Sequence, residues 1–313
     1  MNSFIVCLNA VFPIAVMLAI GYGVRMLRLI NDSEIKKLNK VIFQTFLPAN
    51  LFYNIYSSNI SSALNTKLIL YSFLVVFSMF LISILYTKVF LKNYVAERSV
   101  IMQGIFRSNF VLIGLPIAIE LCPGVDTSIV SVLIAVVVPA NNILSVFALD
   151  MFRKEKADPG TVLLNILKNP LIIASVFGIV SLVVGLKLPS CIEKSLSQMG
   201  KAASPVLLLL LGASFRFKKI GSRIVPLAHT LVSRLVIMPG LFLTLTYILG
   251  FRSVNFVSLI GITASATGVS SFTMAQQGNA DAELAGDIVV LSNALCPITI
   301  FLWSFIFKSI GAF

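Results

Sequence analysis

Long apolar runs alternate with short polar segments from one end of the chain to the other. Each run has about 20 residues, which is the length that an α-helix needs to cross a hydrocarbon layer of roughly 30 Å. We therefore predict ten membrane-spanning helices, called spans 1 to 10. Their approximate bounds are 4–27, 38–56, 67–91, 99–121, 127–151, 162–186, 195–215, 224–249, 254–277 and 286–308. The pattern predicts an all-α polytopic membrane protein.

The composition supports this interpretation and excludes a soluble globule. Of the 313 residues, 58% are hydrophobic and 12% are charged, whereas about a quarter of a soluble domain is charged. Ten spans leave about ten residues for each connecting loop, so no soluble domain fits between them. Span 1 has neither a basic leading segment nor a cleavage site, so we expect it to be retained rather than removed as a signal peptide.

The net charge of +12 comes from Lys and Arg in small groups between the spans. Such scattered groups are typical of topology determinants, and they do not form the basic surface that nucleic acid requires. Alternate loops carry 16 basic residues on one side and 6 on the other. Because basic loops stay in the cytoplasm, both termini are expected to face outward. The deciding clusters are Lys36/Lys37/Lys40, Arg153/Lys154/Lys156 and Arg216/Lys218/Lys219/Arg223.

Proline spacing indicates an internal repeat. Pro13 and Pro170 are 157 positions apart, as are Pro48 and Pro205, and Pro139 is 158 positions from Pro297. These pairs fall at like points of spans 1 and 6, 2 and 7, and 5 and 10. We therefore divide the chain into repeats 1–157 and 158–313. Five spans per repeat is an odd number, so the second repeat must enter the membrane from the opposite side, which is an architecture of secondary transporters.

Two polar stretches occupy matching places in these repeats. Residues 107–116 of span 4 include Gly114, which lacks a side chain, and Pro116, which lacks a backbone donor, so the helix is expected to open there. Adding 157 to residues 109–116 gives residues 266–273, which are the most polar part of span 9. Unwound backbone at membrane depth persists only when it is buried in protein or lines a wet cavity. We predict a binding site where the two breaks cross, and a simple kink in span 4 is the alternative.

The candidate substrate-binding residues lie in these two stretches: Ser108, Asn109, Gly114, Pro116, Thr267, Gly268, Ser270 and Ser271. Asn109 offers amide donors and a carbonyl acceptor, which suit a carboxylate, although a helix-to-helix hydrogen bond is its alternative role. For the other asparagines within spans, interhelical hydrogen bonding is favoured. They are Asn50, Asn54, Asn141, Asn142 and Asn293.

Arg107 and Arg234 lie well inside spans 4 and 8. Arginine at membrane depth is costly and is usually functional or paired. Two roles remain open for this pair: an electropositive pathway that attracts an anion, or hydrogen bonds to neighbouring carbonyl groups. In the first case, they argue for an anionic substrate.

Three stretches of the chain resemble the auxin efflux carrier family, which includes plant carriers and bacterial malonate-type permeases. The stretches are Leu38-Asn39-Lys40 with Phe46-Leu47-Pro48-Ala49, Ser108-Asn109 with Gly114-Leu115-Pro116, and Ser270-Ser271-Phe272 with Ala275-Gln276-Gln277-Gly278. The resemblance covers essentially the whole chain. It implies ten helices in two inverted repeats with spans 4 and 9 crossing, similar to bile acid and sodium-proton transporters. It also implies a scaffold of spans 1, 2, 6 and 7 that can form a homodimer, and a moving transport unit of spans 3–5 and 8–10.

The chain departs from the family pattern in two places. Ala266 stands where many relatives have a proline, and Ser271 where plant members often have another, so we expect a less sharply broken span 9. The connection at residues 152–161 is short. A short connection favours a bacterial-type permease of the inner membrane over a plant carrier.

We therefore predict a secondary carrier for a small organic anion, a mono- or dicarboxylate of the malonate or auxin kind. A passive channel and a ligand-sensing receptor are the alternatives. An enzyme is disfavoured, because the serines in the spans have no His or Lys partner that would activate them. Cys7, Cys122, Cys191 and Cys296 form no metal motif with His229, the single histidine, so no metal or cofactor is expected.

Coupling to protons or sodium stays open, because acidic residues deep in the spans are scarce and Asp287 is the nearest exception. The pairing of Cys122 with Cys191 also stays open, with free thiols preferred.

Overall fold

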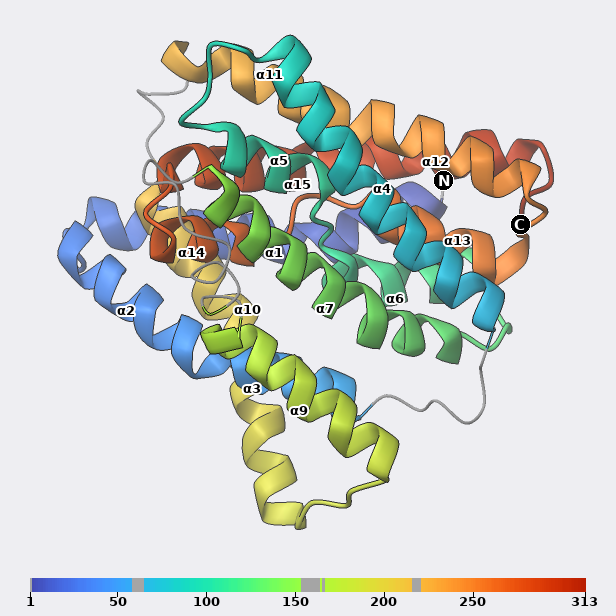
Figure 1. Cartoon of the computed structure of the whole chain (residues 1–313), viewed down its shortest axis with the longest axis horizontal. Coiled ribbons are helices and arrows are strands. Elements are labelled where there is room, and N and C mark those ends of the chain that lie inside the picture. Colours follow the sequence, from blue (N-terminus) through green and yellow to red (C-terminus); the bar gives the residue numbers. More distant parts are fainter. Residues whose placement is uncertain (1, 58–64, 153–163, 165–166, 216–220) are drawn as a thin grey trace.

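A computed structural model describes residues 2–57, 65–152, 164, 167–215 and 221–313, and in this part of the chain the regular structure is helical (Figure 1). The helices of the first half are α1 Asn2–Met26, α2 Asp32–Gln44, α3 Phe46–Tyr56, α4 Thr66–Phe90, α5 Arg98–Phe106, α6 Phe110–Leu121 and α7 Ser128–Met151. Those of the second half are α9 Pro170–Val184, α10 Ser190–Ser214, α11 Ile224–Val232, α12 Met238–Ile248, α13 Ser253–Thr263, α14 Ser270–Gln277 and α15 Ala282–Ser309. A short 3₁₀ turn, Gly221–Arg223, precedes α11, and a π-helical turn, Ser233–Ile237, joins α11 to α12.

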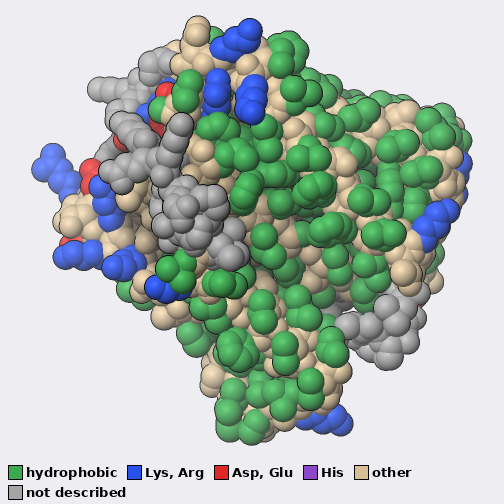
Figure 2. All heavy atoms as spheres, viewed as in Figure 1, with side chains coloured by type: hydrophobic (Ala, Val, Ile, Leu, Met, Phe, Trp, Pro, Cys, Tyr) green, Lys and Arg blue, Asp and Glu red, His purple; other side chains and the backbone are tan. Residues whose placement is uncertain are grey.

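The surface is apolar in the way that a lipid-facing protein requires. Figure 2 shows hydrophobic side chains over most of one face, with the charged side chains gathered mainly toward one end. Large apolar residues such as Phe73 and Phe77 of α4 and Phe177 of α9 are exposed. Five described stretches are long and apolar enough to cross a membrane: Thr66–Phe90, Val132–Met151, Ser190–Ser214, Ile224–Ile248 and Ala282–Ser309. The prediction of an all-α integral membrane protein is therefore confirmed.

Several predicted boundaries differ from the observed ones. The expected span 2 is divided into α2 and α3 at Thr45, whose φ and ψ are −126° and −66°. Pro48 explains the division, because proline removes a backbone donor and its ring clashes with the carbonyl four residues earlier, here that of Gln44. Helix α15 begins at Ala282 instead of 286, since the Asp281 side chain caps it by accepting a hydrogen bond from the Leu284 backbone N–H. The start of the expected span 6, the repeat boundary at 157 and the basic residues 153–156 and 216–219 lie outside the described residues.

Helices α1, α3, α9 and α10 pack together as one group. Two glycines allow the backbones of α1 and α10 to touch. A Cβ atom on Gly21 would lie 2.0 Å from the Leu209 carbonyl oxygen, and one on Gly212 would lie 2.1 Å from that of Leu18. Only glycine fits at such a close approach, as in other membrane helix pairs.

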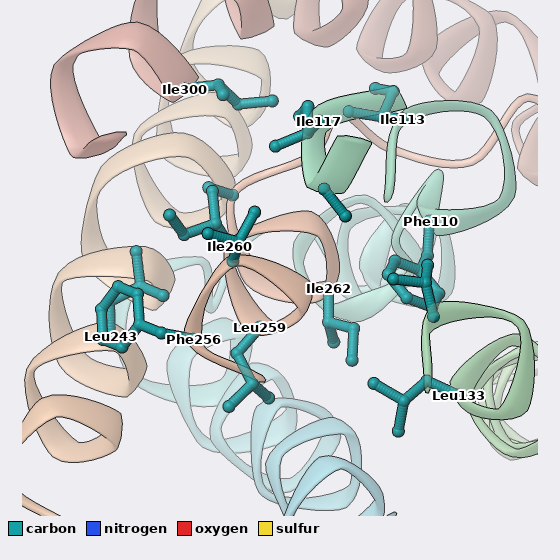
Figure 3. Close-up of a cluster of buried hydrophobic side chains, with 14 of the residues drawn as sticks. Phe110, Ile113, Ile117, Leu133, Leu243, Phe256, Leu259, Ile260, Ile262 and Ile300 are labelled. Atoms are coloured by element: carbon teal, nitrogen blue, oxygen red, sulfur yellow. The ribbon is translucent and has the colours of Figure 1, made fainter. Parts of the chain in front are cut away.

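A second group forms around α6 and α13, which pack on each other and on α7. Figure 3 shows their buried side chains, including Phe110, Ile113 and Ile260. A Cβ atom on Gly261 would lie 2.9 Å from the Gly114 Cα atom, so these two glycines bring α6 and α13 into backbone contact. This packing holds two interrupted helices side by side at the centre of the molecule.

Candidate functional site

Two interruptions of regular helix meet at the centre of the protein. The first separates α5 from α6 at residues 107–109, and the second separates α13 from α14 at residues 264–269. Ser108 and Thr267 form an antiparallel β-bridge. The Asn109 backbone N–H donates to the Ala266 carbonyl (2.8 Å), and the Gly268 N–H donates to the Arg107 carbonyl (3.2 Å). Each segment therefore supplies partners for polar groups that the other exposes, as the membrane interior requires.

The positions of these interruptions correct two expectations. Gly114 and Pro116 lie within α6, so the first break occurs at residues 107–109 and not at the glycine and proline. Gly114 serves instead as the contact point with α13. The second break was expected to be the less pronounced, but it is the longer one, with six residues outside regular helix against three. The segment is not helical even though it has Ala266 in place of a proline. Its unwound backbone finds other partners, because the Ser265 carbonyl accepts from Arg234 and the backbone of residues 266–268 bonds to that of residues 107–109.

Arg234 lies in the π-helical turn and is completely buried. Its Nε atom donates to the Ser265 carbonyl at 2.8 Å, and its Nη atoms donate to the carbonyls of Ile105, Phe106 and Ile262 at 3.2–3.4 Å. These carbonyls belong to the C-terminal ends of α5 and α13, where a helix carries about half a negative elementary charge. Arg234 thus binds both negative helix ends, as in the second of its two proposed roles, and it does not line the central cavity.

Arg107 occupies the first interruption and is 5% exposed. One Nη atom donates to the Asn142 Oδ1 atom (2.6 Å) and to the Ser270 hydroxyl (2.7 Å), and the other contacts the Met274 sulfur. Among the described residues, no carboxylate forms an ion pair with Arg107. The described hydrogen-bond partners of this cation are therefore all uncharged.

A cavity of about 80 Å³ lies beside the bridge. Arg107, Ser108 and Asn109 line it from the first interruption, Gly268 lines it from the second, and Ser270 lines it from the start of α14. The group around α10 contributes Leu47, Asn50, Leu51, Leu171, Ser204 and Leu207. The described lining contains one cation and no carboxylate, so the cavity suits a small anion that has an apolar part.

Other candidate residues lie elsewhere. Thr267 is fully buried, and its hydroxyl donates to the Gly104 carbonyl at 2.8 Å. With Ser271 and Gln103 it borders a separate small void behind the bridge. The structure thus places four of the eight candidate ligands, Ser108, Asn109, Gly268 and Ser270, in the cavity lining with Arg107, whereas Gly114, Thr267, Ser271 and Arg234 do not belong to the described lining. Of these, only Thr267 takes part in the bridge.

Two asparagines of α7 line the cavity although the sequence favoured interhelical bonding for them. Asn142 accepts from Arg107, and the Asn141 Nδ2 atom donates to the Ser108 hydroxyl at 3.2 Å. Their bonds are interhelical, as expected, and they also place both side chains in the lining. Two consecutive polar residues, two and three positions after Pro139, were the signal in the sequence. Asn50 of α3, in contrast, donates from its side-chain amide to the Gly200 carbonyl of α10 at 2.7 Å, so its bond stays within the group of α1, α3, α9 and α10.

A larger cavity of about 500 Å³ lies near α2, α10, α14 and the start of α15. Arg223 binds Asp281 (3.2 Å) and Glu283 (3.3 Å) there. Phe272 borders this large cavity, whereas Ser270 borders the small one. The first turn of α14 therefore separates the two cavities.

Asn39 of α2 ties down that separating helix. It is fully buried, donates to the Gln276 Oε1 atom (2.5 Å) and accepts from the Thr273 hydroxyl (2.8 Å). Asn39 thus links the α2 side of the molecule to the helix that begins beside the candidate site.

Two described cysteines, Cys122 and Cys191, form no disulfide bond; the first is buried and the second is exposed. The sequence had left a pairing of Cys122 with Cys191 open, and the structure has none.

Comparison with known families gives one finding that bears on this site. The profile of a family described as membrane transport protein matches residues 6–304, which include all the described helices from α2 to α14. A search of curated proteins finds no match to this chain.

Proposed function

The chain belongs to the membrane transport protein family, and on that premise we propose that it is a secondary carrier of a small organic anion, bound in the cavity beside the two helix interruptions. The substrate is a mono- or dicarboxylate. In this proposal, the ten spans form two inverted repeats whose broken helices cross at the site. The protein resides in a bacterial inner membrane with both termini outside.

The electrostatics of the interruptions support an anionic substrate. Four half-helix ends lie in this region: the C-terminal ends of α5 and α13 and the N-terminal ends of α6 and α14. Arg234 binds the two negative C-terminal ends. The positive N-terminal ends begin at or beside Asn109 and Ser270, which line the cavity together with Arg107. Partial positive charges and a full positive charge are thus concentrated at one cavity, which attracts an anion.

The single observation that carries the proposal is the state of Arg107. A guanidinium in the membrane interior is costly unless it is paired. Here its described partners are a thioether, an amide oxygen and a hydroxyl. A substrate carboxylate would supply the missing negative charge through charge-assisted hydrogen bonds.

The position of the cavity favours a carrier over a channel or a receptor. The lining comes partly from α3, α9 and α10 and partly from the interruptions and α7. We assign α1, α2, α3, α9 and α10 to a scaffold that can form a homodimer, and the remaining helices to a transport unit. Since α14 separates the small cavity from the larger one, movement of the transport unit along the scaffold would expose the bound anion to one side at a time.

The test is counterflow in proteoliposomes. Vesicles preloaded with an unlabelled carboxylate are diluted into labelled malonate, lactate or indole-acetate, with and without proton or sodium gradients that report coupling. A carrier concentrates label transiently and saturates with substrate. Flux without saturation or counterflow would indicate a channel, and binding without flux a receptor.

Arg107→Gln tests the site within the same assay. We expect it to weaken apparent affinity at least tenfold, because one charge-assisted interaction in a buried site is worth about 1.5–3 kcal/mol. Arg252→Gln is the matched control. Arg252 also donates to carbonyl groups, those of Tyr247 and Phe251, but it lies outside the cavity. Equal counterflow in the Arg107 variant and the wild type would refute the proposed site.

A further inference from the structure

One buried side-chain atom of a cavity-lining residue has no hydrogen-bond partner in the described part of the chain. The Asn141 side chain is 3% exposed, and its Nδ2 atom is used by the bond to the Ser108 hydroxyl. Its Oδ1 atom is buried and accepts no hydrogen bond from any described residue. Buried amide oxygens are nearly always satisfied, so a buried acceptor without a described partner, on a residue of the cavity lining, marks a place that a ligand donor would fill.

This acceptor belongs to the residue that precedes the hydrogen-bond partner of the cation, Asn142. Arg107 and Ser108 are consecutive on one strand of the bridge, and Asn142 and Asn141 are consecutive on α7. Arg107 bonds to Asn142, and Ser108 bonds to Asn141. The two bonds run in parallel between the same two segments, so a charge for a carboxylate and an acceptor for a donor group are neighbours in the lining.

The rest of the lining limits the body of the ligand. Leu47, Leu171 and Leu207 border the cavity from three different helices, α3, α9 and α10. The cavity measures about 80 Å³. A short aliphatic group fits this apolar side, whereas a second carboxylate there would lie against leucine side chains without a counter-charge.

We propose that the substrate is a short 2-hydroxycarboxylate with a single carboxylate group. Its carboxylate binds Arg107, its hydroxyl donates to the Asn141 Oδ1 atom, and its aliphatic end contacts the leucines. This inference rests on the proposed function, since it names the substrate class of the same site.

The experiment compares three-carbon acids that differ at one position. Propionate, lactate and pyruvate have the same chain length, but carbon 2 carries no polar group, a hydroxyl donor or a carbonyl acceptor, respectively. Each acid competes against labelled lactate in the counterflow assay. We expect lactate to compete about tenfold better than propionate, because one neutral hydrogen bond contributes roughly that factor, and we expect pyruvate to be no better than propionate. Malonate is expected to compete less well than lactate.

Variants of α7 test whether Asn141 causes the expected preference for lactate over propionate. Asn141→Leu keeps the side-chain size and removes the acceptor, so propionate and lactate should compete equally in this variant. Ser145→Ala is the matched control, because Ser145 is also a buried α7 residue with an unpartnered hydroxyl but does not line the cavity. The lactate-to-propionate ratio should stay at its wild-type value in the control.

The outcomes separate this inference from the proposed function. Equal competition by wild-type lactate and propionate would overturn it, as would preference for malonate. Preference for pyruvate would also overturn it, because the amide would then present its N–H group to the ligand. If Asn141→Leu does not fold, the wild-type series alone decides. Failure of every carboxylate to compete, or full activity of Arg107→Gln, would instead reject the proposed function.

Discussion

Replacing Arg234 with methionine should destabilise the protein by separating the two interrupted helices from their shared partner. Methionine fills similar space but removes five hydrogen bonds, four to carbonyls and one to the Ser265 hydroxyl. The 2.8 Å bond from Nε is worth about 1.5–3 kcal/mol, and each of the four longer bonds about 0.5 kcal/mol. The expected loss is therefore about 3.5–5 kcal/mol, which lies within the cost of removing one partner from a buried charged interaction.

The chain offers a direct reporter for this change. Trp303 is the single tryptophan, and its indole N–H donates to the carbonyl of Leu235, the neighbour of Arg234. We expect thermal unfolding in detergent, followed by tryptophan fluorescence, to show a Tm lowered by roughly 6–10 °C. Arg234→Lys keeps the positive charge but loses the planar guanidinium with its several donors. Its Tm should therefore lie between those of the wild type and Arg234→Met. Arg252→Gln serves as the exposed control. An unchanged Tm in Arg234→Met would show that the C-terminal ends of α5 and α13 are stable without this guanidinium.

Three further variants test the packing around the site. Gly21→Ala should abolish or strongly destabilise folding, because its Cβ atom would lie 2.0 Å from a backbone oxygen of α10. Gly23→Ala has open space at the Cβ position and should be tolerated. Expression level and Tm report both variants. Asn39→Ala removes both hydrogen bonds to α14 and should lower stability by about 1–3 kcal/mol; an unchanged Tm would contradict the link. Thr267→Val loses the bond to the Gly104 carbonyl and should cost about 1 kcal/mol in thermal unfolding, and a stabilised variant would count against that bond.

The helices were largely predictable because their signal is local. An apolar run of sufficient length forms a helix in lipid whatever its neighbours are, since no other backbone structure satisfies its own polar groups there. The predicted spans 1, 3 and 5 agree with α1, α4 and α7 to within two residues. Even the division at Thr45 has a local cause, Pro48, although proline alone does not show whether a membrane helix bends or stops.

The interruptions were predicted in the right stretches but at the wrong residues. Gly114 and Pro116 are the strongest helix-breaking residues near the first break, yet α6 includes both. The break occurs at Arg107, Ser108 and Asn109, whose backbone groups find partners more than 150 positions away along the chain. Such partners are invisible to a local pattern. Intrinsic preference was therefore overridden by tertiary hydrogen bonds.

The sequence by itself determined a helical membrane protein with polar stretches at matching places in its two halves, because hydrophobicity and spacing are properties of the chain alone. The tertiary structure alone decided which arginine faces which charge. Arg107 and Arg234 look equivalent in sequence, but one borders a cavity with the N-terminal ends of two half-helices, and the other binds the C-terminal ends of the other two. That difference depends on the order in which four helix ends meet in space, and electrostatic energy falls off over distances that only folding sets.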